Sequence, residues 1–591
     1  DCSGDVLAKQ LDEDNDPEND RLLWQASKQL PVPAQRVIFT SHKDVESGAT
    51  VGSFFTMDEL TDAQKAHLGE SVIEQQNILN YLRGDRSNEK INEEAPGYRK
   101  REIAIGDIVN SNPLFVSKPK DMAYSARQSF MDISDKALPA EIPGADTYSA
   151  FLEAHSTRQN MLYVGANDGM LHAFNADTGE EVFAYVPDAV FPKLSKLAAS
   201  SYNNVVPSNH QYFVDGSPNV GEAYFNDAWR SVLVATLGAG GRAVFAMDVT
   251  DPLGFDTGKV LWEINESDVP ELGYMVGQLT EQQVIGRTYS GDWVAIFGNG
   301  YDSGANESYK NLNCDDPIAE NESRCKALEE QIGAHLLVVD IATGHVIKSI
   351  QASTGSKTLD ARNGLSSVAV IRDRNSTVVS IYGGDLQGNL WKFDFAHTVP
   401  NSWKIAYNGS PLFRATDANL NPQPIVAPPD VGQYKYGTRM IYFGAGQFMR
   451  VGDPENVQVQ SMYGVWDSYT DRPSETDGEP PTWIIPEAVC GAENSDCLSK
   501  IDRPIATRST ELQEQKILKK IDPPDSSDAP WPVISHTEFS YFPPEADETQ
   551  RGWYIDLLVV DGTPDGQRIT AQPKILPVAG KLTFTTQLPP G

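Results

Sequence analysis

One strand–turn–strand pattern recurs along this 591-residue chain and limits the folds open to it. A hydrophobic strand ends in Gly, a polar turn containing Gly follows, and an aromatic-bearing strand closes on Asp before a further turn. The clearest copies are VGANDGMLHAFNADTG (164–179), LLVVDIATGHVI (336–347) and GGDLQGNLWKFD (383–394). Internal repetition of this kind is typical of a β-propeller, whose radially repeated sheets leave only short edges. The sequence therefore predicts an all-β propeller.

The N-terminal part of the chain differs from the rest in its residue pattern. Residues 1–100 contain an acidic run and then apolar residues at helical spacing: Leu60, Ala63, Leu68, Val72, Ile78, Leu79 and Leu82. Asp58 or Thr56 is expected to cap the first helix, and Gly69 to end it. We therefore predict a partly helical N-terminal extension over residues 1–100 and the propeller over residues 101–591. Roughly six to eight blades of about 50 residues would use the available length.

The charge balance excludes one class of partner. The chain carries 82 acidic and 48 basic residues, a formal net charge of −34. Such a surface repels phosphate backbones, so nucleic-acid binding is not expected, whereas calcium and basic protein patches would be attracted. The alternative is a solvated acidic exterior that keeps an exported protein soluble. No apolar run is long enough to cross a bilayer, so membrane insertion is not expected either.

The five cysteines indicate an oxidising compartment. Cys314 and Cys325 lie close together in one polar loop, and Cys490 and Cys497 in another, at spacings that do not match zinc ligand pairs. Two short-loop disulfides are the simplest interpretation, which places the protein in the periplasm, on the cell surface or in the medium. Cys2 is left over and is expected to pair upstream. The chain starts without Met and stops in TTQLPPG, so we interpret it as a piece of a longer exported protein.

The sequence does not favour an enzyme. Residues 163–182 resemble the repeat of pyrroloquinoline-quinone dehydrogenases, a resemblance that implies a quinone held between a Trp and a vicinal Cys–Cys disulfide, beside calcium. No two cysteines are adjacent in this chain. Without the residues that hold the quinone, the reaction that the quinone carries out is not expected. GxSxG, HExxH and Walker motifs are missing too. The glycine-rich residues 237–246 predict a tight blade turn rather than a phosphate site. His172 is expected to be packed or hydrogen bonded rather than catalytic.

An ordered series of motifs is more specific. FVDGSPNVGEAYF, WRSVLVATLGAGGRAVFAMDVTDP, GGDLQGNLWKFD, FGAGQF and MYGVWD follow the first repeat, and YLRGDRSNE and IGDIVNSNPLFV precede it. From about residue 75 to the end, the chain resembles the C-terminal domain of the PilY/PilC family of type IV pilus tip-associated adhesins. The resemblance implies a modified, about seven-bladed, quinoprotein-like β-propeller. It leaves a quinone-dependent dehydrogenase on the same scaffold as the alternative function.

The resemblance also implies what the protein does and where. The family acts at the pilus tip in assembly, counters retraction, and supports twitching motility and attachment to host cells or surfaces. The partners implied are minor pilins at the pilus tip and host or abiotic surface receptors. The location implied is the periplasm, outer-membrane surface and pilus tip of a Gram-negative bacterium. One propeller face would dock on the minor pilins and leave another for adhesion, with the two cysteine-bearing loops at the exposed face or on the rim.

Two stretches are candidate calcium sites. The family carries an EF-hand-like loop before its GGDLQGN strand, and here Asp373 and Asn375 match its first and third positions. Thr377 replaces the fifth ligand and Ile381 stands at the ninth, so a plain blade turn is the alternative.

The second candidate is LDEDNDPEND (11–20). Its carboxylates stand at loop positions one, three, five and nine, with a position-seven carbonyl from a fifth residue: Asp12, Asp14, Asp16, Asp20 and Glu18. Pro17 replaces the usual Gly and Leu23 the usual Glu, so the sequence predicts either calcium in a looser geometry or an unstructured acidic insertion.

The tripeptide Arg83, Gly84, Asp85 is a candidate receptor-binding motif, because a guanidinium and a carboxylate on a short loop suit integrin-type receptors. The alternative is structural. The tripeptide follows an apolar helical run, so it would simply end a helix, with Gly84 as the C-terminal cap.

Overall fold

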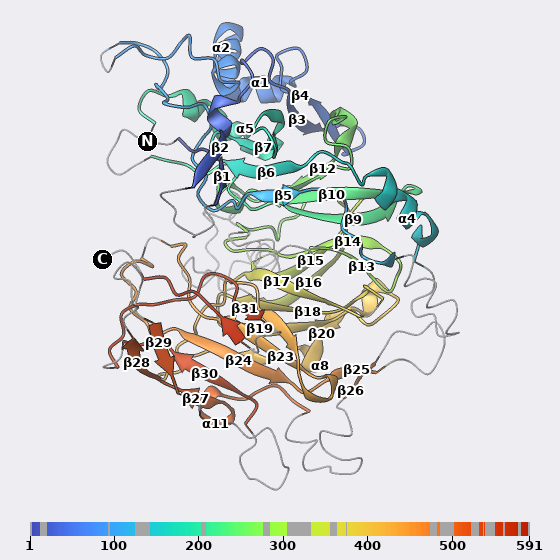
Figure 1. The fold of residues 1–591 in the computed structure, drawn as a ribbon, viewed down its shortest axis with the longest axis vertical. Coiled ribbons are helices and arrows are strands. Elements are labelled where there is room, and N and C mark those ends of the chain that lie inside the picture. Colours follow the sequence, from blue (N-terminus) through green and yellow to red (C-terminus); the bar gives the residue numbers. More distant parts are fainter. Residues whose placement is uncertain are drawn as a thin grey trace, which may run out of the picture.

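The computed structural model shows a mostly β chain whose sheets follow one another in sequence order (Figure 1). It describes residues 3–588 apart from 12–19, 93–94, 125–141, 203–208, 276–283, 304–331, 355–362, 374, 451, 473–481, 485–501, 522–530, 536, 538–549, 560–561 and 577–580. Among these described residues, five sheets have four or more strands. The predicted number of about seven blades stays a prediction.

The first two sheets contain the N-terminal elements and the first repeat. The first has the order β4–β3–β8–β7–β6–β5, with strands Thr50–Phe54, Ile38–Lys43, Glu181–Val186, Met170–Asn175, Met161–Ala166 and Leu114–Val116. The second has the order β12–β11–β10–β9, with strands Val260–Asn265, Ala243–Asp248, Ala228–Thr236 and Asn219–Phe225.

Three further sheets follow. The third is β13–β14–β15–β16, with strands Ile285–Arg287, Trp293–Gly298, Gly333–Asp340 and Val346–Thr354. The fourth is β17–β18–β19–β20 with β21 beside β19: Leu365–Arg372, Val378–Asp385, Asn389–Asp394, Lys404–Ile405 and Phe413–Arg414. The fifth is β22–β23–β24–β30–β27, with strands Asp430–Gln433, Arg439–Gly444, Ser461–Asp467, Gly552–Asp556 and Gln513–Gln515.

All five sheets share a run of four antiparallel strands. The run begins at an edge strand (β5, β9, β13, β17 or β22) and adds later strands in chain order, while β3 and β4 extend the first sheet and β27 extends the fifth. The five strands that begin these runs are called the inner strands below. β9 and β13 contact each other, and Arg287 at the end of β13 forms a parallel bridge with Thr377 of the next sheet. Sheets joined along their inner strands in this way are the blades of a propeller.

The repeated motif is a β-hairpin closed by an acidic cap and a glycine. Between β18 and β19, Asp385 Oδ1 accepts the backbone N–H groups of Gln387 and Asn389, and Gly388 has a φ of +80°. Between β15 and β16, Asp340 and Gly344 take the same roles. A φ in this region is strained for residues with a side chain, which explains the recurring Gly.

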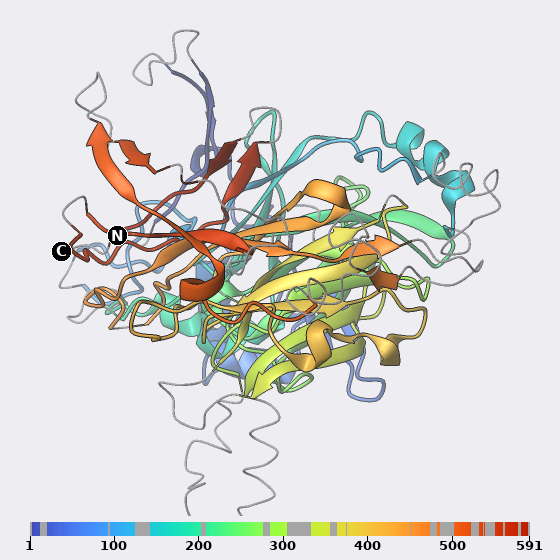
Figure 2. The same ribbon diagram turned by 90° about the horizontal axis from the view of Figure 1, so that it is seen from below.

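The core lies between neighbouring sheets. Tyr185 of the first sheet and Phe245 of the second are both fully buried, with ring centroids 5.1 Å apart. The same face-to-face packing joins each later pair of sheets through Trp262 and Leu337, Ile296 and Ile381, and Tyr382 and Phe443. Figure 2 shows two narrow hairpins standing out from this body, β1–β2 (Leu7–Gln10, Arg21–Gln25) and β28–β29 (Ile517–Ile521, Trp531–Ile534).

The N-terminal extension contains the expected helices, α1 (Asp62–Leu68) and α2 (Val72–Leu82). The predicted cap at Asp58 or Thr56 is wrong. Thr61 Oγ1 accepts the N–H of Gln64, whose side chain accepts the N–H of Thr61, and this capping box starts α1 at residue 62. Gly69 ends α1, as predicted.

The extension also contributes strands to the first sheet. β3 pairs in parallel with β8, through Ile38 opposite Ala184 and Thr40 opposite Val186. Residues on both sides of position 100 therefore share one sheet.

A buried ionic cluster holds this junction. Arg36, just before β3, donates from Nε and Nη2 to the two carboxylate oxygens of Glu181, at 2.6 and 2.7 Å. Glu181 also contacts His172 Nδ1 at 2.8 Å, and His172 Nε2 lies 3.1 Å from Asp168. Burial would lower the pKa of His172, but Asp168 and Glu181 outweigh it and raise the pKa to about 9. Burial would raise the pKa of Glu181, but Arg36 and His172 hold it at about 2. His172 is packed and hydrogen bonded, as the sequence predicts.

Replacing Glu181 by Gln leaves Arg36 and His172 buried without their shared anion. We expect the free energy of unfolding to fall by about 3–5 kcal/mol, measured by urea denaturation at neutral pH. Glu180→Gln, at the exposed neighbouring position, is the matched control and should leave stability within about 0.5 kcal/mol of the wild type. Equal urea midpoints for the two variants would contradict the role of this cluster.

The raised pKa of His172 makes stability depend on pH. The protonated ring is favoured by folding, so its contribution is complete below pH 6.5 and is lost as pH rises through about 9. Over that window the wild type should lose on the order of 3 kcal/mol through this group. His172→Gln should flatten the slope in denaturation series at several pH values, while His67→Gln, on the exposed side of α1, should keep it. A wild-type slope that survives His172→Gln would refute the assignment.

Candidate functional site

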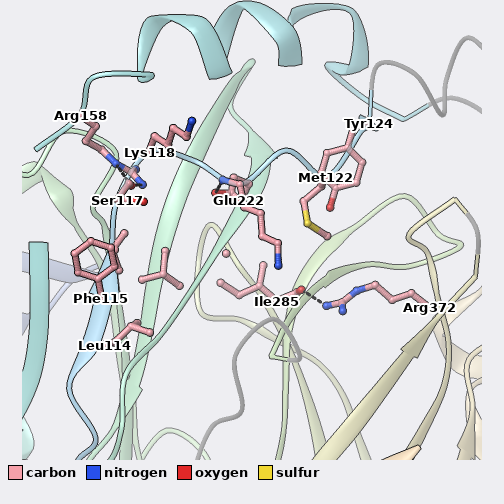
Figure 3. Close-up of a pocket in the computed structure, with 14 residues that line it drawn as sticks. Leu114, Phe115, Ser117, Lys118, Met122, Tyr124, Arg158, Glu222, Ile285 and Arg372 are labelled. Atoms are coloured by element: carbon pink, nitrogen blue, oxygen red, sulfur yellow. Dashed lines mark hydrogen bonds between the residues drawn. The ribbon is translucent and has the colours of Figure 1, made fainter. Parts of the chain in front are cut away.

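A pocket of about 210 Å³ opens where inner strands from the first four sheets meet (Figure 3). Its walls come from β5 and the segment after it, from β9 and β13, and from the last residue of β17. Charged residues on the walls are Lys118, Lys120, Arg158, Arg372 and Glu222. We call it the basic pocket, because four cations face one carboxylate in a chain whose net charge is −34.

Backbone carbonyls orient the two arginines. Arg158 donates from Nε and Nη2 to the carbonyl of Ser117 and from Nη1 to Ser231 Oγ, 2.8 Å away. Arg372 donates from Nη2 to the carbonyl of Ile285 at 2.6 Å. Arg158 and Lys118 lie on one side of the pocket and Arg372 on the other (Figure 3). Burial lowers the pKa of both guanidinium groups, yet arginine stays charged, so both cations are poorly hydrated.

The remaining walls are apolar. Leu114, Phe115, Val116, Met122 and Ile285 contribute them, and the Phe115 side chain is 58% exposed. Burial raises the pKa of Glu222, which accepts the backbone N–H of Lys120 at 3.3 Å. The pocket therefore combines cations, two of them held by hydrogen bonds, with apolar walls, which suits an amphipathic anionic group.

Two glycines let neighbouring sheets approach each other here. A Cβ on Gly221 of β9 would lie 3.2 Å from the side chain of Ile285, and one on Gly286 of β13 would lie 2.7 Å from that of Val378. An aromatic cluster supports the pocket from behind: Tyr124 stacks on Trp229 at 5.1 Å and meets Trp293 edge-on at 5.5 Å. The walls are thus set by close packing.

A second pocket, also about 210 Å³, is lined by residues between strands, some of which precede inner strands. Its lining is Asn110, Asp215, Gly216, Gly238, Met275, Val426, Phe448, Met449, Thr570 and Gln587. Asp215 accepts hydrogen bonds from the backbone and side chain of Asn110, at 3.1 and 2.7 Å, and so holds the start of the chain segment that leads into β5. This pocket carries no comparable set of cations among its lining residues.

At the predicted calcium position near β18, the structure shows a turn closed by its own aspartate. Asp373 Oδ1 accepts the N–H groups of Asn375 and Thr377, and Oδ2 accepts the hydroxyl of Tyr289 at 2.8 Å. The aspartate thus serves the turn, the alternative that the sequence left open, and calcium binding at this position stays a prediction. Among the residues described here, no group of three His, Cys, Asp or Glu side chains is placed to hold a metal.

The acidic decapeptide connects β1 to β2. Of its predicted ligands, Asp20 stands just before β2, whereas Asp12, Asp14, Asp16 and Glu18 lie outside the described residues. Calcium binding there stays a prediction. The predicted disulfides, Cys314 with Cys325 and Cys490 with Cys497, and the left-over Cys2 also lie outside the described part of the chain.

The Arg83–Gly84–Asp85 tripeptide ends α2. Arg83 is the C-cap, Gly84 follows with a φ of +104°, and Asp85 Oδ1 accepts the N–H of Ser87. The Arg83 guanidinium donates to three backbone carbonyls, those of Pro33, Arg36 and Phe55. Its donors therefore hold α2 against the N-terminal segment, and receptor binding by this tripeptide stays a prediction.

Sequence reasoning missed the basic pocket. Its cations stand at positions 118, 120, 158 and 372, separated by as much as 254 residues of chain (372 less 118), and only the folded sheets bring them together. The one local signal is the pair Lys118 and Lys120 around a proline, directly after the motif IGDIVNSNPLFV.

The fold and the central position of the pocket define the class of protein, a β-propeller whose inner strands carry the candidate binding site. The model of the PilY1 beta-propeller domain matches residues 105–479, and the chain belongs to this family. The predicted resemblance and fold class are confirmed.

Individual relatives support the same family assignment. The chain is 31% identical to a type IV pilus biogenesis factor PilY1 homolog of Xylella fastidiosa, over 96% of this chain and 35% of that protein. It is 33% identical to the type IV pilus biogenesis factor PilY1 of Pseudomonas aeruginosa strain PAK, over 84% of this chain and 37% of that protein. The chain thus spans about a third of the length of these relatives.

A solved structure supports the fold assignment as well. The crystal structure of the Pseudomonas aeruginosa PilY1 C-terminal domain matches with a TM-score of 0.57 and 29% identity, over 80% of this chain and 83% of that one. A quinohemoprotein alcohol dehydrogenase from Comamonas testosteroni has a TM-score of 0.24 and 12% identity, too remote to bear on function. No helix within the described residues is long and apolar enough to cross a membrane.

Gly221→Val tests the packing that shapes the pocket. The branched side chain would meet Ile285, so we expect the free energy of unfolding to fall by about 1–3 kcal/mol through overpacking. Gly452→Val is the control, since a Cβ at Gly452 has no neighbour within 4 Å among the described atoms. Guanidinium denaturation of both variants measures the difference, and equal stabilities would show that the inner strands are not in tight contact.

Proposed function

We propose that this chain is the propeller module of a type IV pilus-associated protein and that it works by binding other proteins rather than by catalysis. The observation that carries the proposal is membership of the PilY1 beta-propeller family, whose matched relatives are named pilus biogenesis factors. This function requires that the protein be exported by a Gram-negative bacterium. We propose that it is present in the periplasm, on the outer-membrane surface and at the pilus tip.

The proposed mechanism is surface complementarity on a rigid scaffold. Blades packed face to face hold the loops and inner strands in fixed positions, as recognition requires. We propose minor pilins at the pilus tip as the partners of one face. Host-cell or abiotic surface receptors would then contact another face, which would link the module to pilus assembly, retraction control, twitching motility and adhesion.

A quinone-dependent dehydrogenase is not favoured. The chain lacks the adjacent cysteines that such a site needs, and its matched relatives are named as pilus factors rather than as enzymes. Calcium is proposed as a modulator held by the acidic residues between β1 and β2. The Arg83–Gly84–Asp85 tripeptide is proposed as a receptor contact through its carboxylate and backbone. The Arg83 guanidinium is left out because it already donates to backbone carbonyls.

Calorimetric titration with a purified minor pilin complex tests this function. We expect saturable binding with a Kd of about 1 μM or tighter, equivalent to roughly −8 kcal/mol. An unrelated pilin-fold protein of similar charge serves as the negative control. A lack of heat with the minor pilins, in buffers both with calcium and with chelator, would overturn the proposal for this part of the protein.

The same titration tests calcium. If the acidic segment is the modulator, calcium should tighten binding in the wild type, and Asp12→Ala with Asp14→Ala should remove that dependence. Asp58→Ala, at an exposed site in another part of the extension, should preserve it. Identical affinities with calcium and with chelator would remove calcium from the mechanism.

A further inference from the structure

The geometry points to the basic pocket as the docking site for an acidic segment of a protein partner, one in which carboxylate side chains flank an apolar side chain. The inference deepens the proposed function and rests on it, because the partner is taken to be a protein of the pilus. It names the chemistry that this surface would select.

Local charge is reversed at the pocket. The chain as a whole has a net charge of −34, which would keep an acidic partner away from most of its surface. At physiological ionic strength, charges separated by more than about 8 Å are largely screened. Within the pocket, Lys118, Lys120, Arg158 and Arg372 therefore dominate the potential that a bound carboxylate meets.

The donors that would bind carboxylates are in place before any partner arrives. Lys118 and Lys120 are exposed, and no ion pair to either occurs among the described residues. The Arg372 guanidinium has five N–H donors, and its hydrogen bond to the carbonyl of Ile285 uses one. Because that bond and those of Arg158 fix the two planar groups, little side-chain entropy remains to be lost on binding.

Size and lining favour a side chain over a free small molecule. A volume of about 210 Å³ is below the ~300–1,000 Å³ usual for small-molecule and cofactor sites. The apolar lining residues Phe115, Met122 and Ile285 would contact an aromatic or aliphatic side chain, while the cations pair with neighbouring carboxylates. A peptide segment offers both groups at once.

Fluorescence anisotropy with a labelled peptide that alternates Glu and Phe tests this chemistry on the full 591-residue chain. We expect binding that weakens as salt rises and that falls at least tenfold in Lys118→Glu with Lys120→Glu. Lys28→Glu with Lys100→Glu makes the same change in net charge at exposed positions elsewhere, and should bind like the wild type. Thermal unfolding of each variant checks that folding is unchanged.

Equal peptide affinities for the two double variants would overturn the inference. So would a peptide that fails to bind while inorganic phosphate or phosphatidylglycerol vesicles bind the wild type directly and not Lys118→Glu with Lys120→Glu, since the pocket would then be a phosphate site. A peptide with Gln in place of Glu should not bind, which separates carboxylate recognition from apolar contact.

The same variants in the minor pilin titration keep the two proposals apart. If the wild type and Lys118→Glu with Lys120→Glu bind the pilins equally, the pocket is not the docking site and the pilus function stands. If the wild type binds the acidic peptide through the pocket but not the pilins, the recognition chemistry stands and the choice of minor pilins as partner fails. Loss of both interactions in the pocket variant alone supports both.

Discussion

The sheets of this chain have apolar faces that must be covered, and most of that cover comes from the neighbouring sheet. That constraint underlies the rest of the structure. Burying one large apolar side chain contributes about 1.5–3 kcal/mol, whereas an exposed ion pair contributes about 0–1 kcal/mol. The contact of Tyr185 with Phe245, and the buried cluster that contains Ile296 and Ile381, therefore matter more to stability than the many surface carboxylates. Blades that pack in this way bring their inner strands together, and the basic pocket exists because those strands meet.

The hairpins were the part of the fold that local sequence could predict. An Asp that caps a turn and a Gly at positive φ are short-range signals, and Asp385 with Gly388 shows them in the structure. The helix ending at Gly69 is predictable for the same reason, while the start of α1 was misplaced because three candidate caps stand within a few residues and only Thr61 is completed by Gln64. Propeller repeats are recognisable since each blade repeats the same local chemistry.

Long-range features could not be predicted in this way. Nothing in the residues around Ile38 indicates a parallel partner near Ala184, because strand periodicity specifies a face but not a neighbour. The basic pocket was not predicted for a related reason. Its lysines and arginines look like ordinary surface residues in the sequence, and they form a site only because the fold brings them together. Of the predicted sites, the aspartate near β18 serves a turn, and the Arg83 guanidinium serves a helix end.

The parallel pairing of β3 with β8 has a mechanical consequence. β3 lies between β4 and β8, and Arg36 at its start is bound to Glu181 at the start of β8. Tension applied to the chain upstream of β3 acts along the strand, so it loads the hydrogen bonds to both neighbours in shear rather than one by one. Those bonds and the buried ion pair must yield together. The junction between the N-terminal segment and β8 is therefore built to resist a pulling force along the chain.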